Sequence, residues 1–279
     1  MSSRSVLATV FALFVLFLYG PMISILVLSF QGPEGGLVFP MNGWSVHWYD
    51  KLTSDGGQVQ IADAFWRSLA LALTVMVLTV VISVLAGLAF RRRFWGASAL
   101  LYVAIASLIV PSIVVSLGIA LEFRLIDSAI KDTGLFPSFV SALGPFSSGL
   151  GAHLTWTLPF GLLIMFAVFN RFDPAYEEAA RDLGATPWQT FRHVTLPMIA
   201  PFLIGVAVFG FTLSWDELAR SSQVMGAKNT LPMQLAAKTT TVTDPEIYAL
   251  GSATSGGSLM LVGVALTLAN LLRRRRARA

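Results

Sequence analysis

Residues 68–90 read SLALALTVMVLTVVISVLAGLAF, and this stretch decides the fold because it contains no charged side chain. A helix needs roughly 18–20 apolar residues to cross a bilayer core of about 30 Å, and this stretch is longer. Further uncharged stretches cover residues 5–33, 94–121, 133–170, 193–215 and 247–272. The sequence therefore predicts an all-α protein that crosses a membrane several times.

The composition excludes most other classes of protein. Of 279 residues, 55% are hydrophobic and 12% are charged, against roughly 25% charged in an ordinary soluble domain. The chain has no cysteine, which excludes disulfides, thiolate nucleophiles and Cys-ligated metals. We interpret the net charge of +4 as cytoplasmic anchoring charge that contacts membrane lipid, and we expect no nucleic-acid partner.

We expect one transmembrane domain, residues 1–279, with six helices. The first is too long for the apolar core of a signal peptide and is expected to remain uncleaved. Glycine and proline interrupt residues 133–149, which predicts a loop followed by a single helix. The expected spans are 6–30, 68–90, 95–121, 150–170, 197–215 and 247–271.

Basic residues predict the orientation of these spans. With the N-terminus in the cytoplasm, the inner segments carry 12 basic and four acidic residues, and the outer segments seven basic and 11 acidic. Because Lys and Arg favour cytoplasmic loops, we expect both termini in the cytoplasm.

The sequence contains no recognisable catalytic or metal-binding constellation. There is no phosphate-binding Gly-x-x-x-x-Gly-Lys-Ser/Thr loop and no His-Glu-x-x-His pair. No predicted span carries a cluster of charges at its middle and no internal repeat is obvious, although a self-sufficient secondary carrier or channel would need one or the other. A membrane-embedded enzyme would need an acid, base or metal constellation at one depth, and none is visible. Those two classes are the alternatives to a transport subunit that is energised from elsewhere.

The cytoplasmic segment 171–197 is the most informative connection. Asp173-Pro174 predicts a helix start, and Gly184 predicts its left-handed end. The helix between them has an apolar stripe formed by Tyr176, Ala179, Ala180 and Leu183. We place its charged residues mainly on the remaining surface: Glu177, Arg181 and Asp182.

A second short helix is predicted to follow. Thr186-Pro187 repeats the capping pattern, Trp188 and Phe191 lie three residues apart, and Pro197 is expected to break the chain before the fifth span. A helix–glycine–helix with an exposed tryptophan suits a docking element. An amphipathic connector lying on the bilayer surface explains the same pattern.

The segment also resembles a known family. Glu178-Ala179-Ala180, then Gly184 after three residues, then residues 194–197 (VTLP) after nine more are similar to the E-A-A-x3-G-x9-I-x-L-P loop of ATP-binding-cassette importer permeases. Val194 in place of Ile is the one departure. The flanking residues 172–174 and 182–188 look like the spermidine/putrescine-type branch.

The resemblance continues over nearly the whole chain. Matching segments are Tyr19-Gly20-Pro21, Ser29-Phe30, Trp48-Tyr49, Pro111 with Val114 and Gly118, residues 213–217 (LSWDE) and Thr230-Leu231-Pro232. Arg67, where the family commonly has Asn, and residues 221–223 depart from the pattern. Both departures lie on the expected outer side, so they bear on the substrate.

The resemblance implies the permease fold of a type I importer in a bacterial inner membrane. The implied partners are a second permease that forms a heterodimer with this chain, two cytoplasmic ATPase subunits and an extracytoplasmic substrate-binding protein. ATP and Mg²⁺ would bind to the ATPase subunits, and this chain would bind no cofactor. The residues implied to couple with the ATPase are Glu178, Ala179, Ala180, Gly184, Trp188, Phe191, Leu196 and Pro197.

Trp215, Asp216 and Glu217 are the candidate substrate-pathway residues, at the outer end of the fifth span. An acidic pair there would attract a cation such as a polyamine. A solvated helix end, or pairing with Arg220, explains the same residues.

Overall fold

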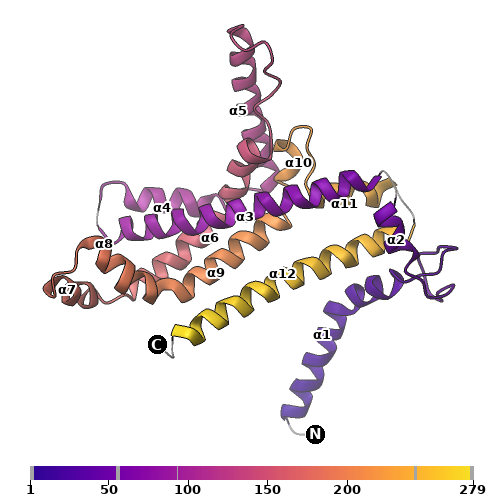
Figure 1. The fold of residues 1–279 in the computed structure, drawn as a ribbon, viewed down its shortest axis with the longest axis horizontal. Coiled ribbons are helices and arrows are strands. Elements are labelled where there is room, and N and C mark those ends of the chain that lie inside the picture. Colours follow the sequence, from indigo (N-terminus) through magenta and orange to yellow (C-terminus); the bar gives the residue numbers. More distant parts are fainter. Residues whose placement is uncertain (1–2, 55–56, 93, 242–243, 277–279) are drawn as a thin grey trace. The chain divides into compact units, whose positions relative to one another are not determined.

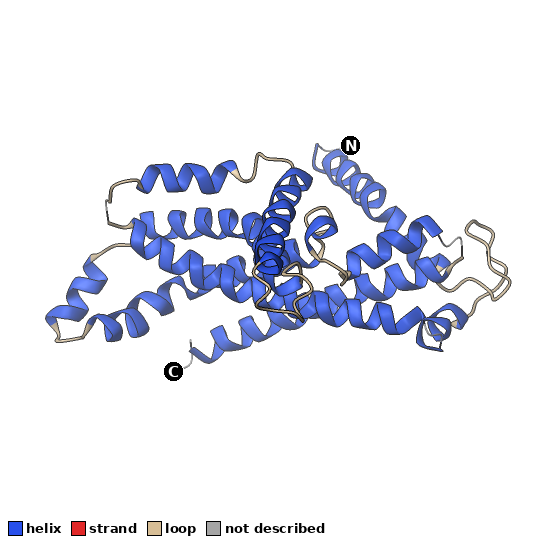
Figure 2. Cartoon of the chain, turned by 90° about the horizontal axis from the view of Figure 1, so that it is seen from above, coloured by secondary structure: helices blue, strands red, loops and turns tan. Residues whose placement is uncertain are grey.

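A computed structural model of the chain describes residues 3–54, 57–92, 94–241 and 244–276. Figure 2 shows helices and loops, and no strand, among these residues. The expected all-α fold is confirmed. The helices are α1 (Ser3–Leu28), α2 (His47–Ser54), α3 (Gly57–Phe90), α4 (Ala97–Ala106), α5 (Ser112–Asp132), η1 (Pro145–Gly149), α6 (Leu150–Asn170), α7 (Ala175–Asp182), α8 (Pro187–Thr190), η2 (Phe191–Thr195), α9 (Leu196–Trp215), α10 (Ser221–Val224), α11 (Leu231–Thr241) and α12 (Glu246–Arg276).

Five helical segments of the described residues are long and apolar enough to cross a membrane. They are Arg4–Leu28, Ile61–Phe90, Pro145–Asn170, Pro187–Trp215 and Glu246–Val264. Ala97–Ala106 is a shorter apolar helix. The predicted spans 68–90, 150–170, 197–215 and 247–271 each fall on one long helix, and 6–30 extends two residues past the end of α1.

The third predicted span, 95–121, is not one helix. α4 ends at Ala106 and α5 begins at Ser112, and Figure 1 shows α5 turning away from α4. Pro111 lies at the break with an extended backbone (ψ 132°). Proline lacks an N–H group and disfavours helix at the residue before it, which favours a break at this position. α5 then continues to Asp132, beyond the expected end at residue 121.

The described residues group into two compact units. One comprises Met1–Ala62 with Gln234–Ala279, and the other comprises Asp63–Met233. The expectation of a single domain over residues 1–279 stays a prediction. In the first unit, α1 packs against α12, and the buried indole of Trp48 donates to the carbonyl of Gln31 at 3.0 Å. Most apolar side chains of α1 are exposed, which suits contact with lipid.

The second unit is organised around α3, α6 and α9, and α6 and α9 lie side by side (Figure 1). Small residues let these helices approach closely. A Cβ atom added at Gly87 of α3 would lie 2.7 Å from the ring of Phe169 in α6, and one at Gly210 of α9 would lie 3.3 Å from Thr79 in α3. Thr79 also shares a 2.7 Å hydroxyl–hydroxyl hydrogen bond with Thr157 of α6. This packing fixes α3 against both neighbours.

Candidate functional site

Nearby residues determine both the start of α7 and the turn after it. The carboxylate of Asp173 accepts a hydrogen bond from the N–H of Ala175, the first residue of α7, at 2.9 Å, and Pro174 between them is the N-cap residue. Gly184 has φ +86°, and its N–H donates to the carbonyl of Arg181 at 2.8 Å. The predicted left-handed end of α7 at Gly184 is confirmed. Only glycine adopts this conformation without strain.

α8 begins where the sequence predicts. The N–H of Gln189 donates to the hydroxyl of Thr186 at 3.3 Å, and the N–H of Thr186 donates to the side-chain oxygen of Gln189 at 2.8 Å. This reciprocal capping box, with Pro187 after the cap, fixes the start of a very short helix.

The two aromatic residues of this region have different environments. The ring of Phe191 packs against the apolar core around Met165 and Ile199. The side chain of Trp188 is 65% exposed, with its ring centroid 5.7 Å from that of Phe191. Phe191 therefore anchors the segment, and Trp188 is free to contact a partner.

Pro197 does not break the chain, contrary to the prediction. α8, the π-helical turn η2 and α9 follow one another without interruption, so that helical structure runs from Pro187 to Trp215. Pro197 is the second residue of α9 and follows the π-helical turn η2, so its missing N–H falls where the helical hydrogen-bond pattern changes. Leu196 beside it packs against the same apolar core as Phe191.

The apolar stripe of α7 is largely uncovered. Tyr176 is 54% exposed and Leu183 is 90% exposed. Ala179 is also exposed, whereas Ala180 is half-buried.

Glu177 differs from the expectation for α7. The sequence places it on the helix surface beside the apolar stripe, but it is buried. Its carboxylate accepts two hydrogen bonds from Arg91, at 2.8 and 3.0 Å, and one from the hydroxyl of Thr195 at 2.6 Å. Arg181 lies 3.6 Å away. Arg91 is 86 residues away in sequence, and no local pattern indicates this contact.

Electrostatics keep Glu177 ionised. The hydrogen bonds from Arg91 lower the pKa of its carboxyl group below the ordinary 4.5, against the opposing effect of burial. The hydrogen bond from Thr195 and the charge of Arg181 act in the same direction as Arg91. At neutral pH the group is a carboxylate facing a guanidinium.

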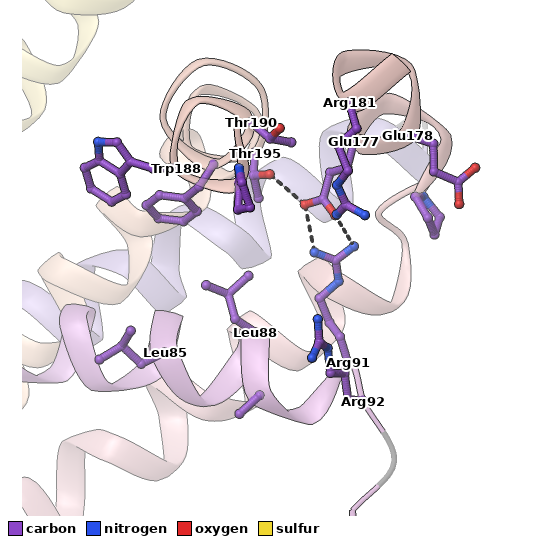
Figure 3. A pocket seen from close by; sticks show the side chains of 14 residues that line it. Leu85, Leu88, Arg91, Arg92, Glu177, Glu178, Arg181, Trp188, Thr190 and Thr195 are labelled. Atoms are coloured by element: carbon purple, nitrogen blue, oxygen red, sulfur yellow. Dashed lines mark hydrogen bonds and ion pairs between the residues drawn. The ribbon is translucent and has the colours of Figure 1, made fainter. Parts of the chain in front are cut away.

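This ion pair borders a pocket of about 810 Å³ between the end of α3 and helices α7 and α8 (Figure 3). Glu177 points toward Arg91, whereas the adjacent Glu178 is exposed and points away from it. Trp188 lies at the other side of the pocket. The lining residues are Leu85, Leu88, Ala89, Arg91, Arg92, Pro174, Glu177, Glu178, Arg181, Pro187, Trp188, Thr190, Phe191 and Thr195.

The two acidic residues after the end of α9, Asp216 and Glu217, have different environments. Asp216 is exposed, whereas Glu217 accepts a hydrogen bond from the N–H of Arg220 at 2.8 Å and lies 3.4 Å from its guanidinium. The expectation that Glu217 can pair with Arg220 is confirmed. Trp215 packs against the ring of Phe211, with centroids 5.7 Å apart.

Arg220 is fully buried. Its guanidinium lies 4.5 Å from the ring centroid of Trp156 and donates to the hydroxyl of Ser112 at 2.8 Å. The sequence does not predict that Arg220 is buried, because its partners Ser112 and Trp156 come from α5 and α6.

Residues 79–277 match the family described as "Binding-protein-dependent transport system inner membrane component". The chain is 31% identical over 242 residues to the putrescine transport system permease protein of Escherichia coli, covering 85% of this chain and 80% of that protein. It is 29% identical to the spermidine/putrescine transport system permease protein of Haemophilus influenzae, covering 88% and 89%. The fold is similar to that of a chain in the crystal structure of a bacterial ABC transporter that imports the acidic polysaccharide alginate, with TM-score 0.74, 17% identity and 98% and 94% coverage.

Proposed function

This chain belongs to the family of binding-protein-dependent transport system inner membrane components, and on that premise we propose that its 171–197 segment docks onto an ATPase subunit. The chain is a multi-pass permease subunit of a binding-protein-dependent ATP-binding-cassette importer in a bacterial inner membrane. A self-sufficient carrier or channel is not favoured, because the family consists of components of binding-protein-dependent systems.

The proposed assembly has this chain beside a second, sister permease, with two cytoplasmic ATPase subunits and an extracytoplasmic binding protein. ATP and Mg²⁺ are bound by the ATPase subunits, and this chain binds no cofactor. Hydrolysis in the ATPase subunits and loading of the binding protein would each favour one of two arrangements of the helices, which gives alternating access.

The exposed Trp188 carries the docking proposal. It stands on a helix whose start is fixed by the capping box of Thr186 and Gln189, and it follows the turn fixed by Gly184. A large aromatic side chain that is exposed on a rigid support is typical of an interface anchor. Glu178 is exposed on the preceding helix and supplies a charge for the rim of the same interface.

Reconstitution tests this function. The chain, its sister permease and the ATPase subunits are placed in proteoliposomes, and solute uptake is measured with and without ATP and the binding protein. We expect uptake only when both are present. Uptake by this chain alone, driven by a solute or ion gradient, would instead support a secondary carrier.

We propose a polyamine or a related cationic amine as the solute. The two relatives described above are named as putrescine and spermidine/putrescine permeases. Asp216 offers an exposed carboxylate at the end of α9, whereas the charge of Glu217 is matched by Arg220. Asp216 is therefore the residue of the pair that is available to a cation.

Two substitutions separate the roles of this pair. Asp216→Asn should reduce putrescine uptake roughly ten- to a hundredfold, the usual effect of losing a charge-assisted contact, with little change in melting temperature. Glu217→Gln should instead lower the melting temperature, because it leaves the buried Arg220 without its ion pair. Wild-type putrescine uptake by the Asp216 variant would contradict the assignment of this residue to the substrate pathway.

We also propose that both chain termini lie in the cytoplasm. Because the chain has no cysteine, single cysteines at exposed positions report sidedness. Ser222→Cys should react with an impermeant maleimide added outside intact cells, and Asp182→Cys should react only after the membrane is opened. The reverse pattern would invert the topology.

A further inference from the structure

An ion pair ties the end of α3 to α7 (Figure 3). Both terminal nitrogens of Arg91 donate to the carboxylate of Glu177, at 2.8 and 3.0 Å, and Thr195 of η2 donates to the same carboxylate at 2.6 Å. The side chain of Glu177 is 11% exposed and that of Arg91 is 22% exposed. A bidentate contact with this little access to water holds one geometry. Three elements therefore meet at one carboxylate.

The guanidinium of Arg91 also lies near two aromatic rings. The centre of its guanidinium lies 5.4 Å from the ring centroid of Phe169 and 5.1 Å from that of Phe172. Phe169 is buried in the core and packs directly against Gly87, one helical turn before Arg91. A displacement of α7 therefore meets a guanidinium that also packs against two aromatic rings. Close-packed contacts of this kind transmit movement because they cannot deform freely.

We propose that Arg91 and Glu177 form a strut that transmits the displacement of α7 to α3 when the docked ATPase subunit moves. The proposal rests on the docking of the 171–197 segment described above. Successive residues of a helix point about 100° apart, so Glu177 faces the protein while Glu178 faces outward. Arg91 is a positioning residue in this proposal, because it acts through Glu177.

The strut depends on geometry as well as charge. The planar guanidinium of arginine offers two parallel donors that match a carboxylate, whereas lysine offers a point charge on a flexible stem. Arg91→Gln should therefore disable the strut, and Arg91→Lys should preserve it in part. The matched control is Arg92→Gln, which removes the exposed neighbouring arginine that lines the same pocket.

Four quantities are measured for each variant in the complete transporter. They are the ATPase subunit retained on purification, basal ATP hydrolysis, hydrolysis stimulated by loaded binding protein, and solute uptake. For Arg91→Gln we expect wild-type retention of the ATPase and a fall in stimulated hydrolysis and uptake of about tenfold or more. Arg91→Lys should be intermediate, and Arg92→Gln should match the wild type.

A double variant tests whether the two residues act as one unit. Because residues in one contact are non-additive, Arg91→Gln combined with Glu177→Gln should lose no more stimulation than Arg91→Gln alone. A merely structural role would lower ATPase retention and stimulation together.

Three results would overturn the strut: full stimulation in Arg91→Gln, losses that multiply in the double variant, or a loss of stimulation that follows a loss of bound ATPase. In each of these cases wild-type docking stands. If the wild-type chain itself retains no ATPase subunit, the docking proposal fails and the strut fails with it.

Discussion

Trp188→Ala is the most direct perturbation of the proposed ATPase interface. The indole is 65% exposed and contacts the ring of Phe191 on one side. Truncating it removes little that the isolated chain buries, so the melting temperature should change little. The loss should be confined to association with the ATPase subunit.

The size of that loss follows from the exposed area. A tryptophan buries on the order of 250 Å² when it is fully covered, so the exposed fraction corresponds to about 160 Å². At about 25 cal/mol per Å² this burial contributes about 4 kcal/mol, and ordering the side chain costs about 1 kcal/mol. We therefore expect a loss of about 2–3 kcal/mol, or roughly 30- to 150-fold in the dissociation constant.

The assay is co-purification of the ATPase at a series of concentrations, followed by hydrolysis with and without loaded binding protein. Trp66→Ala is the matched control, because Trp66 is also 65% exposed but lies near the opposite end of α3 from Arg91. Trp188→Ala should weaken ATPase binding and abolish stimulation, whereas Trp66→Ala should bind the ATPase as the wild type does. Equal binding by both variants would refute the assignment of Trp188 to the interface.

Three further predictions test the local physics. Gly184→Val should cost about 1–2 kcal/mol, because the new side chain must adopt the positive φ of this residue. A Cβ atom added at Gly184 meets nothing within 4 Å, so the cost does not come from a clash. The variant should reduce ATPase co-purification by redirecting α8. Gly87→Ala places a Cβ 2.7 Å from Phe169 and should cost about 1–3 kcal/mol in thermal unfolding; Gly205→Ala, with nothing within 4 Å, should be neutral or stabilising. Because the pKa of Glu177 is lowered from 4.5, its ion pair stabilises the chain above that pH and weakens as pH falls further, so the melting-temperature difference between wild type and Glu177→Gln should shrink below about pH 4.5.

The features that the sequence predicts correctly are those set by neighbours along the chain. Helix α6 occupies Leu150–Asn170, as the uncharged run and the glycine-rich stretch before it predict. The turn at Gly184 and the start of α8 at Thr186 depend on backbone geometry and caps within a few residues. Such interactions involve only residues that are close in sequence, so they can be recognised before the fold is known.

Other features depend on contacts that only the fold brings together. Apolar length alone does not predict the interruption at Pro111, although proline lacks the N–H group that a continuous helix uses. The burial of Glu177 has no local signal, since its partner Arg91 lies on another helix and belongs to a basic run that suggests lipid contact. Asp216 and Glu217 likewise differ in environment because Glu217 pairs with the buried Arg220 and Asp216 is exposed.

An ion pair suits the inner side of the 171–197 segment better than an apolar contact would. Tyr176 and Leu183 of α7 are exposed, so the segment has few apolar side chains left with which to hold itself against the end of α3. A buried ion pair contributes little net stability compared with well-packed apolar residues, but it specifies one partner and one geometry. With Glu177 fixing α7 to α3 and Phe191 fixing the following turn to the core, the segment can be positioned without covering Trp188. The same arrangement leaves Trp188 and Glu178 exposed for the proposed docking, and the proposed strut would link a movement of α7 to α3.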